Sequence, residues 1–184
     1  MMNMSIVDKN NLEYKIEDII KENILKLADI DGSVRENARN ILINIGSPAI
    51  DYLFEMLFHP NVIARWEALK TLIEINDPDI IPLLINALDD SNSAIRWLAA
   101  EGLAAMGENA FMAMLNALAA YPDTVSLRKG VKHVMMRHIE ASKDPNIEEL
   151  VQFFDDPDAD FQLSVLIIPY IENKSEADRM RNSL

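Results

Sequence analysis

The stretch RWEALKTL, from Arg65 to Leu72, is followed 31 residues later by the similar stretch RWLAAEGL, from Arg96 to Leu103. Both segments place Trp directly after Arg, Ala three places after it and Leu seven places after it. Apolar residues three and four places apart fall on one face of an α-helix. The chain therefore contains the same amphipathic helix at least twice, and both of its tryptophans lie in these two helices.

The pattern extends to four arginines with spacings of 30, 31 and 32 residues: Arg35, Arg65, Arg96 and Arg128. Apolar residues stand one place before each arginine, and three and seven places after it: Val34, Ala64, Ile95 and Leu127; Ala38, Ala68, Ala99 and Val131; Leu42, Leu72, Leu103 and Met135. A constant internal pattern at a spacing near 30 residues predicts a solenoid of stacked helical repeats.

A second apolar segment precedes each arginine-bearing segment, so each repeat is expected to be a pair of helices. We call the upstream helix A and the arginine-bearing helix B. Pro48, Pro78 and Pro145 stand where the first turn of helix A tolerates proline. Asp or Asn in the turn between the two helices can cap helix B.

The sequence predicts five such pairs between two terminal segments. Their approximate bounds are 15–46, 47–76, 77–107, 108–140 and 145–171, after an N-terminal extension at 1–14 and before a polar C-terminal tail at 172–184. In the fifth pair Gln162 takes the place of the arginine, and Pro169 is expected to kink or end helix B.

The segments DGSVRENARNIL, NVIARWEALKTL and NSAIRWLAAEGLAAMG resemble the HEAT-repeat family, in its short form known as PBS-lyase-type HEAT repeats. The resemblance covers roughly residues 15–171. It implies an all-α fold, an α-α superhelix or HEAT-like solenoid of about five helix pairs whose B helices line a concave surface. It also implies that the arginines form a structural ladder, pairing with carboxylates or Asn in the turns, often of the neighbouring repeat.

Charge and composition exclude several classes of function. Thirty acidic and 17 basic residues give a formal net charge of −13, which repels a phosphate backbone, so we expect no nucleic-acid partner. The chain has no Cys, which excludes disulfides, thiolate metal sites and Cys nucleophiles within it. No apolar run approaches the ~18 residues of a membrane span, and no signal peptide is recognised. We expect a cytoplasmic protein without a membrane partner.

The candidate partner-binding residues stand one, five and eight places after the arginines, on the side of helix B opposite the core. They are Trp66, Trp97, Lys70, Ile73, Glu101 and His133. Exposed aromatic anchors beside mixed charges suit protein recognition. The alternative is that each Trp lies flat over a neighbouring B helix and only packs.

Groups suited to catalysis or metal binding are sparse. Glu101 and His133 share one repeat position, so a metal site or a proton-handling pair is the alternative to a simple hydrogen-bonded surface pair. The stretch DDPDADF, from Asp155 to Phe161, has alternating aspartates but lacks the Gly and Glu of a calcium loop. The His-Glu dipeptides with which HEAT-like deoxyhypusine hydroxylases hold iron are absent. We therefore expect no metal, no cofactor and no enzymatic activity.

These features favour a non-enzymatic scaffold or adaptor that binds a protein or peptide through the concave B-helix face. The alternative is an enzyme or enzyme accessory in the maturation of a bilin or another cofactor, similar to the bilin lyases that gave the short repeats their name. A sealed polar cavity near Glu101 and His133 would favour the enzyme, and an open groove would favour the adaptor.

Overall fold

The computed structural model describes residues 6–120, 125–142, 145–154 and 160–182. All regular secondary structure in these ranges is helical, and they contain no strand. The chain divides into two compact units, Met1–Ile80 and Ile81–Leu184. No helix in the described ranges has the length and apolar character needed to cross a membrane.

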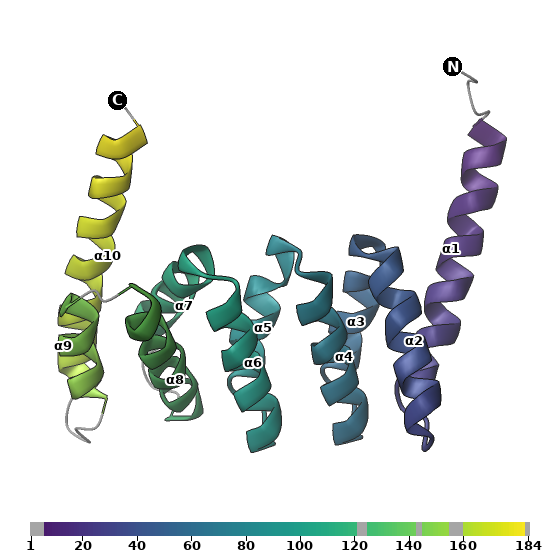
Figure 1. Ribbon diagram of the computed structural model, residues 1–184, viewed down its shortest axis with the longest axis horizontal. Helices are drawn as coiled ribbons and strands as arrows, with labels where there is room; N and C mark the ends of the chain where they lie inside the picture. The colour runs from purple at the N-terminus through teal and green to yellow at the C-terminus, as the bar shows by residue number, and fades with distance from the viewer. Residues whose placement is uncertain (1–5, 121–124, 143–144, 155–159, 183–184) are drawn as a thin grey trace. The chain divides into compact units, whose positions relative to one another are not determined.

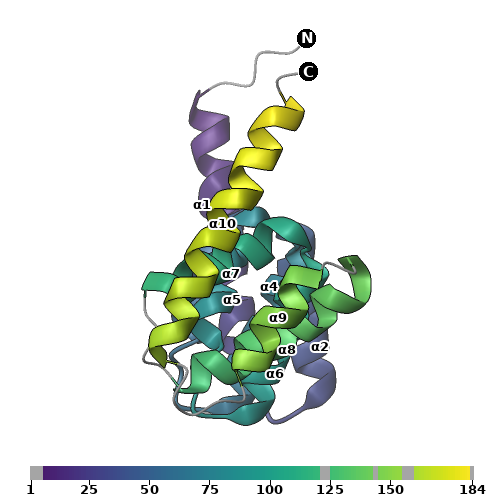
Figure 2. The same ribbon diagram turned by 90° about the vertical axis from the view of Figure 1, so that its left-hand side faces the viewer.

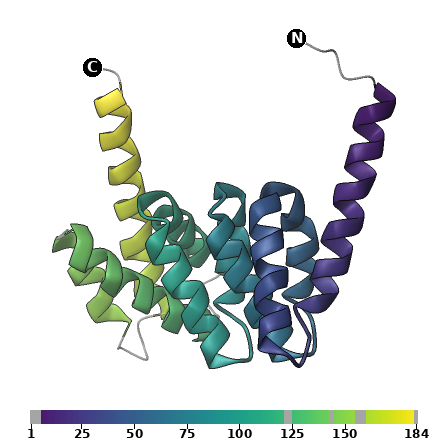
Figure 3. The same cartoon turned by 45° about the vertical axis from the view of Figure 1, so that its right-hand side comes forward.

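The first unit consists of two antiparallel helix pairs. Its elements are α1 (Ile6–Lys26), α2 (Gly32–Ile45), the 3-10 segment η1 (Ser47–Ala49), α3 (Ile50–Met56), α4 (Val62–Ile75) and the 3-10 segment η2 (Pro78–Ile80). Helix α2 packs against both α1 and α4, and α3 packs against α4. Figures 1 and 3 show that the α1–α2 turn and the α3–α4 turn lie at the same end of this unit.

The second unit continues the alternation of helices. Its elements are α5 (Ile81–Ala87), α6 (Ser93–Ala105), α7 (Glu108–Ala120), α8 (Val125–Ser142), α9 (Pro145–Phe153) and α10 (Asp160–Asn182). Helix α8 packs against α6, α7 and α9, and α10 packs against α7 and α9. Figure 2 shows α10 continuing beyond the short helix α9. Helices α2, α4, α6 and α8 are the B helices of the sequence pattern.

Each of three B helices begins at a side-chain cap four places before its arginine. The side chains of Asp31, Asn61 and Asn92 accept a hydrogen bond from the backbone N–H two residues later, at 2.8, 2.9 and 2.9 Å. Such a cap satisfies one of the N–H groups that the first helical turn leaves unpaired. The C-cap residues of α2 and α4 are Gly46 and Asn76, both with positive φ.

The core side of the B helices is formed by the positions three and seven places after the arginine. All of these side chains are fully buried: Ala38, Ala68, Ala99 and Val131; Leu42, Leu72, Leu103 and Met135. Small residues at the first position let the helices approach closely, and larger ones at the second fill the space between them. The all-α solenoid architecture of helix pairs predicted from the sequence is therefore present.

The two ends of the chain differ from the expected organisation. Helix α10 runs through Pro169 and into the expected tail as far as Asn182. Pro169 therefore does not end the helix, and that part of the prediction is wrong. Helix α1 begins at Ile6, inside the expected N-terminal extension. The aspartate-rich stretch at 155–159 and the side chain of Arg128 lie outside what the structure describes.

Candidate functional site: the α6–α8 groove

The three described arginines of the repeat column all make the same contact. The guanidinium Nη1 of each donates to the backbone carbonyls six and five residues earlier, in the turn before its own helix. The distances are 2.8 and 3.1 Å for Arg35, 2.8 and 3.3 Å for Arg65, and 2.7 and 3.1 Å for Arg96. These acceptors are carbonyls of the same repeat, whereas the sequence pointed to side chains, often in a neighbouring repeat.

Arg35 also takes part in a charged cluster that sequence reasoning missed. Its Nε lies 2.9 Å from Glu67 Oε1, and Arg39 Nη1 lies 2.5 Å from Glu67 Oε2. Only 9% of the Glu67 side chain is exposed. The sequence does contain a signal for this cluster. At about 100° per residue, Arg39 lies on one flank of its B helix and Glu67 on the opposite flank of the next B helix, so the two flanks can meet. The cluster joins α2 to α4 within the first unit.

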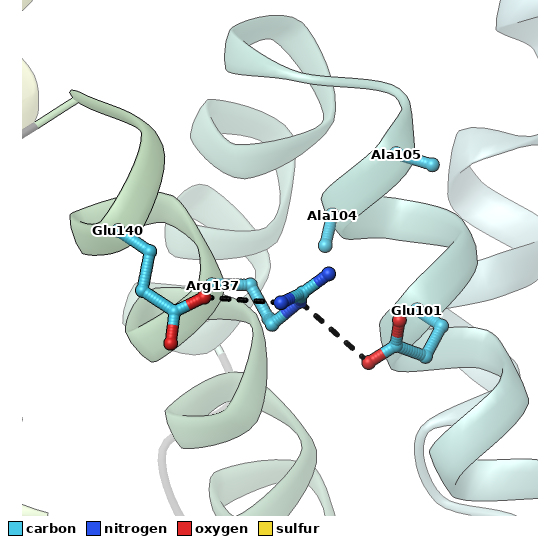
Figure 4. Close-up of a pocket in the computed structure, with 5 residues that line it drawn as sticks. All are labelled: Glu101, Ala104, Ala105, Arg137 and Glu140. Carbon is cyan, nitrogen blue, oxygen red and sulfur yellow. Dashed lines mark hydrogen bonds and ion pairs between the residues drawn. The ribbon is translucent and has the colours of Figure 1, made fainter.

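In the second unit, helices α6 and α8 together line two open pockets. The first, of about 220 Å³, is lined by Ser93, Arg96, Trp97, Ala100, Gly130 and His133. The second, of about 330 Å³, is lined by Glu101, Ala104, Ala105, Arg137 and Glu140. The lining residues of the second follow those of the first along both helices, so we call the two together the α6–α8 groove. Figure 4 shows Arg137 of the second pocket between Glu140 and Glu101, with Ala104 beside its guanidinium group.

Small residues leave room for the groove. At Gly130 an added Cβ would lie 2.7 Å from Cδ2 of Leu88, so a larger residue there would have to displace the Leu88 side chain. Ala100 is buried beneath the first pocket. The groove floor is therefore fixed by the packing of α6 and α8, and the long side chains stand around it.

A carboxylate–imidazole pair spans the groove between the two pockets. His133 Nε2 lies 2.6 Å from Glu101 Oε1, and the side chains are 35% and 30% exposed. Arg137 approaches the same oxygen with Nε at 3.8 Å, and its Nη1 donates to Glu140 Oε2 at 3.0 Å. The sequence had placed Glu101 and His133 at one repeat position, and the structure brings them together. The pair can hold or transfer a proton, and half-exposure leaves it accessible to a ligand.

The aromatic residues of the candidate site differ in exposure. Trp97 is 54% exposed at the edge of the first pocket. Trp66, Lys70 and Ile73 are all half-buried on α4, in the first unit. Because Trp66 and Trp97 belong to different units, a binding surface that includes both stays a prediction. Of the six residues proposed from the sequence, Trp97, Glu101 and His133 meet in one groove.

His138 belongs to a separate cluster on the core side of α8. Its ring stacks on Phe111 with centroids 4.1 Å apart. Its Nε2 lies 3.1 Å from Glu108 Oε2 but without the alignment of a hydrogen bond. His133 and His138 therefore do not converge. The described residues contain no group of three or more His, Cys, Asp or Glu side chains placed to hold a metal ion.

Comparisons with known proteins identify the repeat and one structural relative. A family model for HEAT repeats matches residues 50–136. No curated protein sequence matches the chain. A solved structure, described as the complex of CpcE and CpcF of phycocyanin lyase from Nostoc sp. PCC7120, contains a chain of similar fold with a TM-score of 0.53. The identity is 20%, and the match covers 82% of this chain and 96% of that chain.

This comparison corrects one expectation. The absence of a recognisable catalytic motif suggested a protein that is not an enzyme, and that prediction is contradicted by the similarity to a lyase subunit. The physical reason is that a HEAT array can form one part of an enzyme made of two proteins, so a motif search in one chain does not exclude enzymatic function. At 20% identity the likeness itself establishes the fold. The family match identifies HEAT repeats within residues 50–136, inside the array of helix pairs described above.

Proposed function

We propose that this chain is a subunit of a lyase-type enzyme complex and acts in the maturation of a bilin or another cofactor. The observation that carries the proposal is its similarity to a chain from a two-protein lyase complex, over 96% of that chain's length. A match that spans nearly the whole relative indicates a shared architecture and supports a shared type of assembly more than a match to one repeat would.

The α6–α8 groove is our proposed place of action. It is an open surface groove with an exposed Trp97 at one end and a charged pair, Glu101 and His133, at its centre. An open groove by itself was expected for an adaptor. In a complex of two proteins it also suits an enzyme, because a second surface can exclude water from the groove, and electrostatic interactions strengthen only when water is removed. A protein partner that covers this groove would complete the site, which fits a complex of two proteins.

A conjugated cofactor with carboxylate groups is compatible with the side chains present. Trp97 offers a flat face on which a ring system can stack, and the half-exposed Arg137 can bind a carboxylate. The second pocket, about 330 Å³, lies near the lower end of the ~300–1,000 Å³ typical of ligand sites, and the first, about 220 Å³, lies below it. Because the chain has no Cys, a thiol for covalent attachment of a cofactor must come from another protein.

The first test is direct binding of a bilin. Biliverdin is added to the purified chain, and its visible circular dichroism is followed as a function of concentration. We expect an induced signal with the wild type. Trp97→Ala and Arg137→Gln should each lower the affinity for biliverdin by about tenfold. Arg179→Gln, an exposed arginine on α10, is the matched control and should leave binding unchanged. Equal binding by all four proteins would remove the groove as the site.

The second test addresses the complex. The tagged chain is expressed in its native host, and proteins retained by the wild type but lost with Trp97→Ala are identified by mass spectrometry. The purified pair is then assayed for attachment of a bilin to an acceptor protein, or its removal. A chain that binds neither bilin nor a partner through the groove would contradict the proposal.

A further inference from the structure

The first unit carries an exposed apolar patch that the α6–α8 groove does not include. Five large apolar side chains at its two turns form what we call the turn patch: Ile30, 99% exposed; Phe58, 64%; Ile63, 43%; Val62, 38%; and Phe54, 37%. Exposed apolar patches on a monomer mark interaction sites.

The turn patch is an ordered feature of the fold. Ile30 lies in the α1–α2 turn, and Phe58, Val62 and Ile63 lie at the α3–α4 turn, at the same end of the first unit (Figure 3). Phe54 supports Phe58 through an edge-to-face contact with ring centroids 5.2 Å apart. Both turns are held by the arginine–carbonyl hydrogen bonds of Arg35 and Arg65. The apolar side chains are therefore presented on rigid turns.

A third turn in the same chain shows that the fold does not require apolar residues at these places. The α5–α6 turn has the same arginine contact, through Arg96, and a side-chain cap at the same position, Asn92. Counted from the arginine, the position of Ile30 there holds Ser91. The positions of Phe58, Val62 and Ile63 hold Asp89, Ser93 and Ala94. Polar or small residues thus build the same turn, so the apolar ones serve something other than folding.

Charge decides what covers the turn patch. Asp31 follows Ile30 in the chain, Glu55 follows Phe54, and Asp51 lies one turn before Glu55 on α3; all three are exposed. The cations at these two turns that the structure describes have partners: Arg35 and Arg65 donate to turn carbonyls, and Lys26 pairs with Glu22. A second copy of this chain would bring the same acidic groups against each other, and an anionic lipid surface would also be repelled. A partner with Lys or Arg around an apolar centre would be attracted.

We propose that the turn patch is a docking surface for a different protein, whose contact region is apolar at its centre and basic at its rim. This surface is separate from the α6–α8 groove and goes beyond the function proposed for that groove. Phe58, Ile63 and Ile30 supply the apolar contact. Asp31, Asp51 and Glu55 select the partner by charge.

The test uses two synthetic amphipathic helical peptides with the same leucine face, one carrying lysines and the other glutamates. Binding to the full chain is measured by fluorescence anisotropy. The contact is located by the methyl NMR signals of Ile30 and Ile63. We expect the lysine peptide to bind at least about tenfold more tightly than the glutamate peptide and to shift both signals.

Substitutions that place residues of the α5–α6 turn in the turn patch distinguish binding at the patch from general electrostatic attraction. Phe58→Asp adds a negative charge, so general attraction would make the lysine peptide bind more tightly, whereas loss of the apolar contact weakens it by about tenfold. Ile30→Ser and Ile63→Ala should also weaken it. Circular dichroism checks the helix content of each variant. Trp97→Ala in the groove should change nothing, which distinguishes this proposal from the proposed function.

Three results would overturn the proposal. The first is equal affinity for the two peptides. The second is lysine-peptide binding that Phe58→Asp leaves unchanged or strengthens. The third is a dimer in sedimentation experiments that Phe58→Asp converts to a monomer, because the occupant would then be a second copy of the chain.

Discussion

Arg39 Nη1 lies 2.5 Å from Glu67 Oε2, and this contact joins the second helix of the chain to the fourth. The other oxygen of the same carboxylate accepts a hydrogen bond from Arg35 Nε at 2.9 Å. Two guanidinium groups thus share one carboxylate where little water reaches, since the three side chains are only 9–19% exposed. In such surroundings removing one partner leaves an uncompensated charge.

Glu67→Gln should therefore lower the free energy of unfolding by about 3 kcal/mol or more, because it leaves both guanidinium groups without a counter-charge. Urea unfolding followed by far-ultraviolet circular dichroism measures the loss. Glu74→Gln, at an exposed position of the same helix, is the matched control and should change stability by less than about 0.5 kcal/mol. Similar values for the two variants would show that the cluster contributes little.

Arg96 provides a test of the turn contact. Arg96→Ala should cost about 1–3 kcal/mol, because two carbonyls lose a charged donor at 2.7 and 3.1 Å. Arg96→Lys should recover part of the loss, since an ammonium group can reach one carbonyl but lacks the planar fork. Thermal and urea unfolding give the values, with Arg179→Ala as a surface control. An unchanged melting temperature for Arg96→Ala would rule out a stabilising role.

Asp77 gives a pH-dependent prediction. The Ser47 hydroxyl and the backbone N–H of Asp79 both donate to its carboxylate, and these hydrogen bonds lower the pKa of Asp77 below the usual 3.8. Because the folded-state pKa is the lower one, the stabilisation is present above the unfolded pKa and is lost as the pH falls through the folded value. Ser47→Ala should move the pKa back toward 3.8. Carboxyl-carbon NMR titration measures it, and an unchanged pKa would contradict the assigned cause.

The sequence predicted the repeat and the core because both depend on periodicity. Ala68 and Leu72 are buried where a 3.6-residue period places them, and Asn61 caps the helix that it precedes. The arginine acceptors could not be predicted in the same way. Every turn offers backbone carbonyls, so their selection depends on turn geometry and leaves no trace in residue identity.

Two further differences have local physical causes. Pro169 lies inside α10, where proline costs one hydrogen bond and is disfavoured. Burial of Ile167 and Tyr170 on either side of it favours continuing the helix. The turn patch leaves no periodic signal in the sequence, because it depends on residues that differ between repeats. Ile30 and Phe58 depart from the repeat pattern.

The two tryptophans provide the test that separates binding from packing. Trp97 is 54% exposed, so Trp97→Ala should change the free energy of unfolding by less than about 1 kcal/mol. Trp66 is half-buried, and Trp66→Ala should cost about 2 kcal/mol, below the ~3–5 kcal/mol of a fully buried aromatic. Chemical denaturation of the two variants gives the comparison directly.

Fluorescence adds an independent measurement, because the chain has only these two tryptophans. In Trp66→Phe the remaining Trp97 should be quenched readily by acrylamide, and in Trp97→Phe the remaining Trp66 should be better shielded. A partner or bilin that binds in the α6–α8 groove must then protect Trp97 from the quencher while leaving the shielding of Trp66 unchanged. Equal shielding of both indoles in the free protein would mean that Trp97 packs as Trp66 does. The groove would then lose the aromatic residue on which a ligand is proposed to rest.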